Sequence, residues 1–561
     1  MKYRAICVIL VLCLLAALAV PAGAAFEPVV VTKTSTDMVH TVKSAGRYSN
    51  WAGVSTVSQF SDEAGNFCFA VDQNSKVTVC RTAYGQIVEK TEIFHDYDRF
   101  GAAVCDRNGY LWLVFGNEGS DDVNEKTMFV CKYDWNGNCL GVVGGNGRES
   151  VPNYYGDKYN TRIPFDAGNC DAVVDSNFLV VNYAREMYSG HQSNAVLTMN
   201  LTDMKLIAGG IVFYNSHSFD QRVTVSNDGF LLASQGDCYP RTFTTMAKSL
   251  YGASNEMDTF HFWVEEGTLD RYNMGQLNKT YARLGNVLET PHGAALVGSS
   301  ARSLSEAAKN EPFDVFVQVF DPWGRADDPA SYVTKGQRSG LGGPNGDTPV
   351  TDYGVQWITD LAGTGKTADV VQAISLSGGR IAVLYELYTK RGSSTVYDST
   401  WYTLLDTDGT VRLDPVELEG VRLNVDEDPV YSDGVVQWVA NSGSGLVVYH
   451  LFPTQLPDAR EELEQWRQQM FRLSDGSMKQ EGSDLVVKAV ANTDGVTDTT
   501  VYCAFYEENG KMRYLREHTI RGKETQTVEF TADGGKIAEV RVFMVAEGRA
   551  MCEKIVLRNS E

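Results

Sequence analysis

The chain has 561 residues, 43% of them hydrophobic, which is enough for a large folded core and excludes disorder as the default state. Its formal net charge of −22 at pH 7 repels nucleic acid and anionic membrane surfaces, so neither is expected as a partner. The length accommodates one large β domain and one small domain.

The N-terminus predicts a secretory signal peptide in residues 1–25. Lys2 and Arg4 precede an apolar run over 5–20, and Ala-Gly-Ala at 22–24 supplies the small residues of a cleavage site. The run is short for a membrane span, and we expect no membrane insertion once the signal is removed. We therefore predict a secreted, extracellular protein, with association at the cell surface left open. Removal of residues 1–25 takes away Lys2 and Arg4 and no acidic residue, so the formal net charge changes from −22 to −24.

Eleven cysteines occur in the chain, and nine remain after the predicted signal. Nine is odd, so at least one thiol stays free. No pair has the CxxC spacing of a zinc site, and we predict no metal and no other cofactor. Cys503 and Cys552 are the pair that we consider for a disulfide bridge.

Residues 26–454 repeat a unit of four short strands. The second unit is the clearest, because Asp-Arg-Asn-Gly and Asp-Trp-Asn-Gly turns join its strands at two positions and a long polar loop at the third. Its predicted strands are 100–105, 110–115, 127–133 and 139–143. Four-stranded antiparallel units of roughly 40–50 residues are typical of β-propeller blades.

The same unit recurs along the chain. The first predicted blade has strands 54–60, 67–72, 76–81 and 87–93; the third has 171–175, 178–184, 194–200 and 204–208; the sixth has 370–376, 380–387, 400–406 and 410–418. The fourth begins with 221–226 and 230–234 and carries a long insertion through about residue 283. The fifth contains 293–299 and 315–320. Residues 325–351, rich in Gly, Asp and Pro, predict a surface loop.

The last blade is expected to take strands from both ends of the mature chain. Segments 429–432, 435–440 and 446–452 supply three strands, and 28–33 supplies the fourth. Such a closure removes an exposed sheet edge. The sequence therefore predicts an all-β fold with a propeller of about seven blades.

The pattern changes after residue 454. The most helical stretch is 458–472, which lies in a predicted helical linker over 455–482, with Asp458 as the expected N-cap. Residues 483–561 hold closely spaced strands, which predict a small Ig-like β-sandwich. These strands are 485–491, 500–506, 512–519, 524–531, 539–546 and 551–557.

Three motifs in this last segment carry a resemblance. They are Val-Tyr-Cys-Ala-Phe-Tyr at 501–506, the Asn509-Gly510 turn and Val-Arg-Val-Phe at 540–543. The segment resembles the small β-sandwich at the end of many secreted proteins of clostridial-type bacteria, and the preceding region is similar to bacterial extracellular propellers that carry such sandwiches. The resemblance implies a bacterial, extracellular protein of this architecture and assigns no activity to individual residues.

The antiparallel strand order places the tight turns on one face of the propeller and the long polar loops on the other, which is the expected binding face. The densest polar group lies at the entry to the fourth blade, where a turn at 227–229 pairs Ser226 with Phe230 and brings 216–222 opposite 236–241. The candidate ligand-binding residues of this hairpin are His217, Asp220, Arg222, Asp237, Tyr239 and Arg241. Neighbouring blades are expected to add Asp98, Arg99, Asp171, His191 and His292.

This polar group has two interpretations, and the sequence leaves both open. It forms a pocket for sugar hydroxyls or a peptide, or it forms ion pairs that tie neighbouring blades together. Glycoside hydrolysis requires two carboxyl groups, one of them with a raised pKa. Asp220 and Asp237 are candidate neighbours, but the two arginines of the same hairpin are expected to lower carboxyl pKa values, which argues against a general acid there.

We therefore predict an extracellular, non-catalytic binding or scaffold protein, monomeric, that uses its loop face to bind a glycan or an extracellular protein. The alternative is a carbohydrate-active enzyme, a glycoside hydrolase or a lyase, with its site at the mouth of the propeller channel. Two close carboxyl groups in an open pocket, one of them without an arginine partner, would favour the enzyme.

Overall fold

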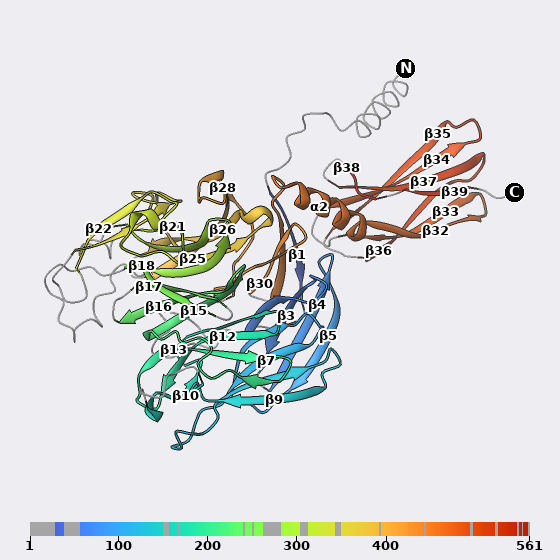
Figure 1. The fold of residues 1–561 in the computed structure, drawn as a ribbon. Coiled ribbons are helices and arrows are strands. Elements are labelled where there is room, and N and C mark those ends of the chain that lie inside the picture. The colour runs from blue at the N-terminus through green and yellow to red at the C-terminus, as the bar shows by residue number, and fades with distance from the viewer. Residues whose placement is uncertain are drawn as a thin grey trace.

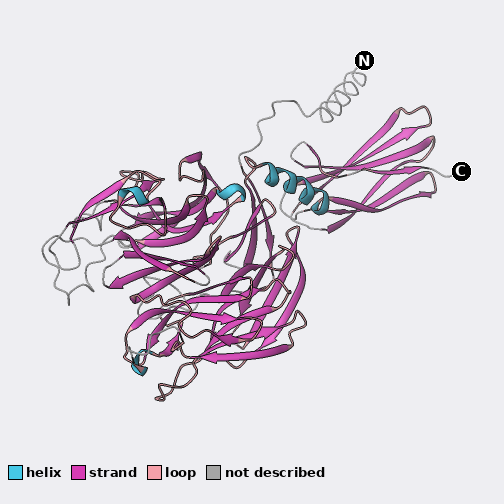
Figure 2. Ribbon diagram, viewed as in Figure 1, coloured by secondary structure: helices cyan, strands magenta, loops and turns pink. Residues whose placement is uncertain are grey.

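The computed structural model describes residues 29–558, apart from 37, 39–55, 74, 150–155, 167, 239–241, 250–251, 262–281, 303–311, 343–348, 392–393, 426, 442–444, 494–497, 522–524, 547–548 and 553. The predicted signal peptide lies outside the described residues. The described chain is all-β with one α-helix, α2 (Pro457–Met470), as Figure 2 shows. No helix in these ranges is long and apolar enough to cross a membrane.

Two four-stranded antiparallel sheets come first and confirm the first two predicted strand groups. One consists of β2 (Val57–Ser61), β3 (Phe67–Asp72), β4 (Lys76–Ala83) and β5 (Gln86–Phe94). The other consists of β6 (Arg99–Cys105), β7 (Leu111–Gly116), β8 (Met128–Tyr133) and β9 (Cys139–Gly145).

The tight turns form for a local reason. In the β6–β7 turn, Asp106 Oδ1 accepts hydrogen bonds from the backbone N–H groups of Asn108 (2.8 Å) and Tyr110 (3.1 Å). Gly109 then takes a φ of 77°, which a side chain would disfavour. An aspartate two residues before the first bonded amide is the usual Asx-turn arrangement. Asp134 and the glycine at 137 repeat it in the β8–β9 turn.

The next two strand groups join into one nine-stranded sheet through the Ser193–Ser216 pair. The first group has β10 (Thr161–Pro164), β11 (Cys170–Asp175), β12 (Phe178–Met187), β13 (Gln192–Asn200) and β14 (Lys205–Leu206). The second has β15 (Ser216–Ser226), β16 (Gly229–Cys238), β17 (Thr242–Ser249) and β18 (Ser254–His261). The expected insertion after residue 234 is therefore wrong in part, because β17 and β18 complete a regular four-stranded unit.

The following groups contain an inserted hairpin. One sheet has β19 (Arg283–Thr290), β20 (Gly293–Ala301), β21 (Phe313–Phe320) and β24 (Gln356–Trp357), and the next has β25 (Lys366–Ser375), β26 (Ile381–Arg391), β27 (Ser394–Leu405) and β28 (Val411–Glu417). Between β21 and β24, strands β22 (Gln337–Gly342) and β23 (Pro349–Tyr353) pair with each other. The surface loop predicted over 325–351 is thus wrong where β22 and β23 form.

The last sheet of the ring takes strands from both ends of the propeller segment. It consists of β29 (Val430–Ser432), β30 (Val435–Asn441), β31 (Leu446–Phe452) and β1 (Val30–Ser35). The β1–β31 ladder runs from Val30 opposite Phe452 to Ser35 opposite Val447. The predicted closure by an N-terminal strand is confirmed.

The sheets surround a common axis (Figure 1). The first strands of successive sheets contact one another in chain order, from β2 and β6 through β11, β15, β19 and β25 to β29, and β29 contacts β2 again. Apolar clusters fill the space between neighbouring sheets, with Trp112 in one and Trp438 in another. This radial packing is a β-propeller.

Helix α2 connects the propeller to two further sheets that pack against each other. One has β32 (Arg472–Glu481), β33 (Asp484–Asn492) and β36 (Thr525–Asp533); the other has β34 (Thr499–Glu507), β35 (Met512–Ile520), β37 (Ile537–Ala546), β38 (Arg549–Ala550) and β39 (Ile555–Arg558). Strand β32 occupies part of the predicted helical linker.

Two local predictions in this region are wrong. The helix begins after Leu456, with Pro457 at its first position, so Asp458 is a first-turn residue and not the N-cap. Its carboxylate instead accepts a hydrogen bond from Tyr431 Oη at 2.7 Å. The disulfide considered between Cys503 and Cys552 does not form. Cys503 is buried among apolar side chains, where a thiol packs as a small hydrophobic group.

Candidate functional site in the propeller channel

The β15–β16 hairpin presents the densest polar group, but its register differs from the prediction. Ser226 pairs with Gly229, not with Phe230, because the turn contains two residues instead of three. Arg222 therefore lies opposite Ala233 rather than Ser234. A one-residue shift exchanges the faces on which the partner strand's side chains lie.

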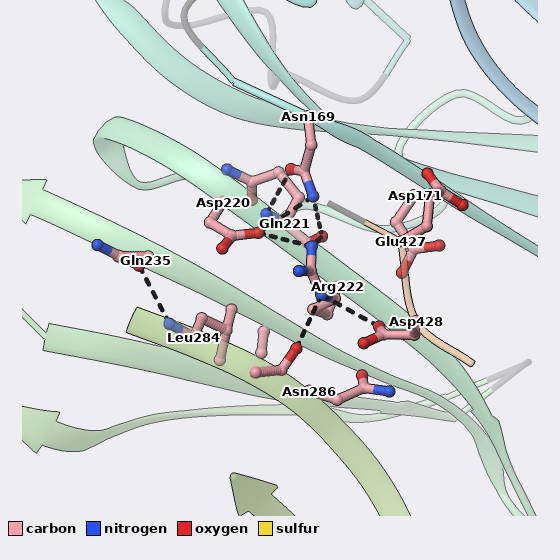
Figure 3. Close-up of polar contacts among 12 residues, drawn as sticks. Asn169, Asp171, Asp220, Gln221, Arg222, Gln235, Leu284, Asn286, Glu427 and Asp428 are labelled. Carbon is pink, nitrogen blue, oxygen red and sulfur yellow. Dashed lines mark hydrogen bonds and ion pairs between the residues drawn. The ribbon is translucent and has the colours of Figure 1, made fainter. Parts of the chain in front are cut away.

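Arg222 is the centre of a buried network (Figure 3). Its Nη1 donates to Asp220 Oδ1 at 2.6 Å, and its Nε lies 3.1 Å from Asp428 Oδ2. Asn169 Nδ2 also donates to Asp220 Oδ1, at 3.1 Å, and Arg222 Nε donates to the Gly285 carbonyl at 3.0 Å. The guanidinium thus connects β15 with the segment before β29 and with β19.

Two further carboxyl groups lie beside this network. Asp171, at the start of β11, accepts a hydrogen bond from the Val223 N–H at 2.7 Å through Oδ2. Glu427, just before β29, accepts one from the Gln59 N–H at 3.1 Å through Oε2. Neither carboxylate forms an ion pair with a described lysine or arginine, and Figure 3 shows the two side by side, away from the Asp220 side of Arg222.

These groups line a cavity of about 300 Å³ on the axis of the propeller. The walls come from the first strands of several sheets, namely β2, β11, β15, β19, β25 and β29. Arg222 is the one basic side chain among the described residues that line it. One cation therefore shares the cavity with the carboxylates of Asp171, Glu289, Glu427 and Asp428, with Asp220 bonded behind it.

Burial controls the protonation of these acids. It raises the pKa of Asp171 to about 6 and that of Asp428 to about 8, although Arg222 acts in the opposite direction on both. The pKa of Glu427 is raised well above its ordinary value by burial and then by the charge of Asp171. At Asp171 and Asp428, desolvation therefore outweighs the attraction of one shared guanidinium.

Asp171 and Glu427 thus share one cavity, and neither forms an ion pair with a described arginine. Burial raises the pKa of both groups, and the charge of Asp171 adds to the rise at Glu427. A neighbouring ionised carboxylate and protonated carboxylic acid are the two groups that acid–base chemistry requires. Gln59 also holds the neighbouring backbone, because its Nε2 donates to the Asp428 carbonyl at 3.0 Å.

The remaining predicted residues occupy different places. His191 and His217 meet at the loop face, with Nδ1 and Nε2 3.4 Å apart. Asp98 is exposed and accepts from the Glu118 N–H at 2.9 Å. Arg99 lies 3.9 Å from Asp166 and does not line the cavity.

His292 lies at the tight-turn end of the β19–β20 ladder. It sits in the β19–β20 turn, next to Thr407 in the β27–β28 turn, with Nε2 3.3 Å from the threonine Oγ1. These are tight turns, so the placement of His292 on the loop face is wrong. Tyr239, Arg241 and the side chain of Asp237 lie outside the described residues.

The sequence prediction missed Asn169, Glu427 and Asp428. A signal was available, because the acidic run 426–428 directly precedes the first strand of a blade, as Asp98 does. Asn169 had no comparable signal, since its role depends on the neighbouring blade. In the described ranges no group of three or more His, Cys, Asp or Glu side chains is arranged to hold a metal ion.

Comparison with known protein families and with curated proteins finds no match for this chain. Among solved structures it is similar to the polysaccharide lyase Uly1, with 9% identity and a TM-score of 0.35 over 79% of this chain and 94% of that one. It is also similar to the Dos1 propeller, with 8% identity and a TM-score of 0.35 over 74% and 82%. An exo-β-1,3-galactanase from Phanerochaete chrysosporium gives 9% identity and a TM-score of 0.22 over 80% and 93%. At these values the likenesses assign no activity.

Proposed function

We propose that this chain is a secreted carbohydrate-active enzyme, a glycoside hydrolase or lyase, with its site in the propeller channel. The observation that carries the proposal is the presence of Asp171 and Glu427 in one cavity, where neither forms an ion pair with a described arginine. This favours the alternative derived from the sequence over a purely non-catalytic scaffold.

In this proposal Glu427 acts as the general acid and Asp171 as the ionised partner. Glu427 donates a proton to the leaving oxygen of the sugar, and Asp171 activates water, attacks the sugar or removes a proton, according to the reaction. Asp428 and Arg222 set the local charge without contacting the scissile bond. Activity is expected to rise as the pH passes about 6, where Asp171 loses its proton, and to fall when Glu427 loses its own.

The architecture belongs to the same proposal. We infer seven blades, because the first strands of seven sheet units contact one another in a ring. We also infer an Ig-like sandwich, because the first, second and fifth strands of the last domain form one sheet and the others form the second. Lys2, Arg4 and the apolar run after them support export from a bacterial cell. We infer that the protein acts as a monomer outside the cell, with cell-surface association left open.

The test is a screen of plant and host polysaccharides with the purified mature chain, followed by mass spectrometry of the products. Glu427→Gln is expected to reduce product formation at least ~100-fold, the usual range for losing a general acid. Glu256→Gln is the control, because Glu256 lies on β18 and does not line the channel cavity. Equal activity of wild type and Glu427→Gln would overturn the assignment.

A non-catalytic binding protein is the second candidate. It is favoured by the closed hydrogen bonding among Asp220, Arg222 and Asn169, which ties neighbouring blades together as a structural network does. Glycan or protein binding without any cleavage product from the screen would support this candidate.

A further inference from the structure

Three arginines are buried in the described chain, and one of them differs from the others. Arg222 is 3% exposed and pairs with Asp220 and Asp428, and Arg338 is 6% exposed and pairs with Asp352 at 2.8 Å. Arg185 is 0% exposed, and no described carboxylate forms an ion pair with it.

Arg185 lies near the end of β12, at the loop end of its ladder. Its Nε donates to Ser193 Oγ on β13 at 3.0 Å, and its Nη1 donates to Thr161 Oγ1 on β10 at 3.1 Å. Tyr183 Oη lies 3.0 Å from the same Thr161 oxygen. Nη2 is buried and has no acceptor. The guanidinium therefore has neutral hydroxyl neighbours on two sides and an unused donor on the third.

A loop packs closely against this side chain. Gly147 has a φ of 78°, and a Cβ there would lie 2.9 Å from Arg185 Nη1 and 2.8 Å from Tyr183 Oη. A glycine is thus required where the backbone covers the guanidinium. The backbone at Gly147 therefore covers the Arg185 side chain and keeps it out of contact with solvent.

Burying the Arg185 guanidinium without a counter-ion costs free energy. An isolated charge without a counter-ion loses several kcal/mol of hydration on burial, and hydroxyl dipoles recover part of that loss. Burial also lowers the pKa of Arg185. An oxyanion at Nη2 would supply both the missing acceptor and the missing charge, and the planar fork of arginine suits carboxylate, sulfate and phosphate groups.

We propose that Arg185, with Thr161 and Tyr183, forms an oxyanion-binding site for a carboxylate, sulfate or phosphate group of a ligand. The site lies next to the turn that carries His191, because Arg185 pairs with Ser193 and the adjacent pair is Glu186 with Gln192. The site does not depend on the reaction proposed for the channel.

The experiment titrates the mature full-length chain with sodium glucuronate, sulfate and phosphate, and with sodium chloride and glucose as controls at matched ionic strength. Calorimetry and thermal unfolding are the readouts. At least one oxyanion is expected to bind saturably and raise Tm by several °C beyond chloride. The three salts distinguish a sugar carboxylate from a sulfate or phosphate ester.

Arg185→Met is expected to reduce oxyanion affinity at least 10-fold. Arg338→Met is the matched control, since it removes another buried arginine that is paired with a carboxylate. It is expected to lower Tm and to keep the anion response. A wild-type chain that responds to no oxyanion more than to chloride would overturn the proposal, and so would an unchanged response of Arg185→Met. The wild-type titration decides the question even if Arg185→Met does not fold.

Discussion

At the scale of single residues, protonation in the channel is decided by a competition between desolvation and one guanidinium. Arg222 contacts Asp220 and Asp428, yet burial still raises the pKa of Asp428 to about 8. Water can solvate every carboxylate of an unfolded chain, whereas the channel offers a single cation. The folded protein therefore binds protons that the unfolded chain would release.

This predicts a stability that falls with rising pH. The pKa values of Asp171 and Asp428 are raised in the folded state, so their contribution is complete below about pH 4 and is lost as the pH passes about 6 and about 8. Asp428→Asn removes one titrating group. Between pH 5 and pH 8, the free energy of unfolding of this variant is expected to decline by about 3–4 kcal/mol less than that of the wild type.

Urea unfolding at four pH values measures this difference. Asp327→Asn is the control, because Asp327 is exposed, pairs with Arg325 at 2.8 Å and has a lowered pKa. It is expected to leave the slope of stability against pH unchanged over this range. An Asp428→Asn slope as steep as that of the wild type would contradict the prediction.

At the scale of elements, helix α2 holds the propeller and the sandwich together through one aromatic side chain. The Trp466 ring lies 4.8 Å from that of His450 and 5.2 Å from that of Phe452, both on β31. The same apolar cluster continues into the sandwich with Leu485 and Phe505. Burial lowers the pKa of His450 to about 3, so this contact stays uncharged at neutral pH.

Trp466→Ala is therefore expected to cost about 3–5 kcal/mol of unfolding free energy, because it leaves a large cavity in a shared core. Trp466 is 5% exposed, whereas Trp323, in a turn, is 40% exposed and serves as the control. Trp323→Ala is expected to change stability by less than about 1 kcal/mol. Denaturant unfolding measures the free energy of unfolding of both variants. Equal decreases in the two variants would show that the Trp466 contact does not stabilise the protein as proposed.

At the scale of the whole molecule, the ring closes by hydrogen bonds between its two ends. Strand β1 pairs with β31 alone, and Thr36 extends the ladder through its N–H and Oγ1 to the Leu446 carbonyl, at 2.9 and 2.8 Å. Without β1, β31 would present a free edge with unpaired backbone groups. Closure therefore affects both the stability of the ring and its tendency to associate.

Two shortened chains test this role. A chain that begins at residue 37 lacks β1 and is expected to lose several °C in Tm and to associate. A chain that begins at residue 29 retains β1 and is expected to keep the higher Tm and to remain monodisperse. Calorimetry and size-exclusion chromatography with light scattering are the measurements. The prediction fails if both chains unfold at the same temperature and remain monodisperse.

The sequence by itself determined the elements whose causes are local. The Asp106 and Gly109 turn follows from side-chain bonding within five residues, and the strand runs follow from apolar and β-branched patterning. Even the N-terminal closing strand was predictable, because the last blade lacked one strand by count. The hairpin β22–β23 was not, since its Gly- and Pro-rich composition resembles a loop.

The tertiary structure alone decided which acids meet and how they are protonated. Asp171 and Glu427 are far apart in the chain and come together only when the ring closes. The pKa values of Asp171 and Glu427 depend on how far the surrounding blades exclude water. Arg185 Nη2 has no acceptor because of how the neighbouring strands pack around it. Desolvation is a property of the packed molecule, so no local pattern contains it.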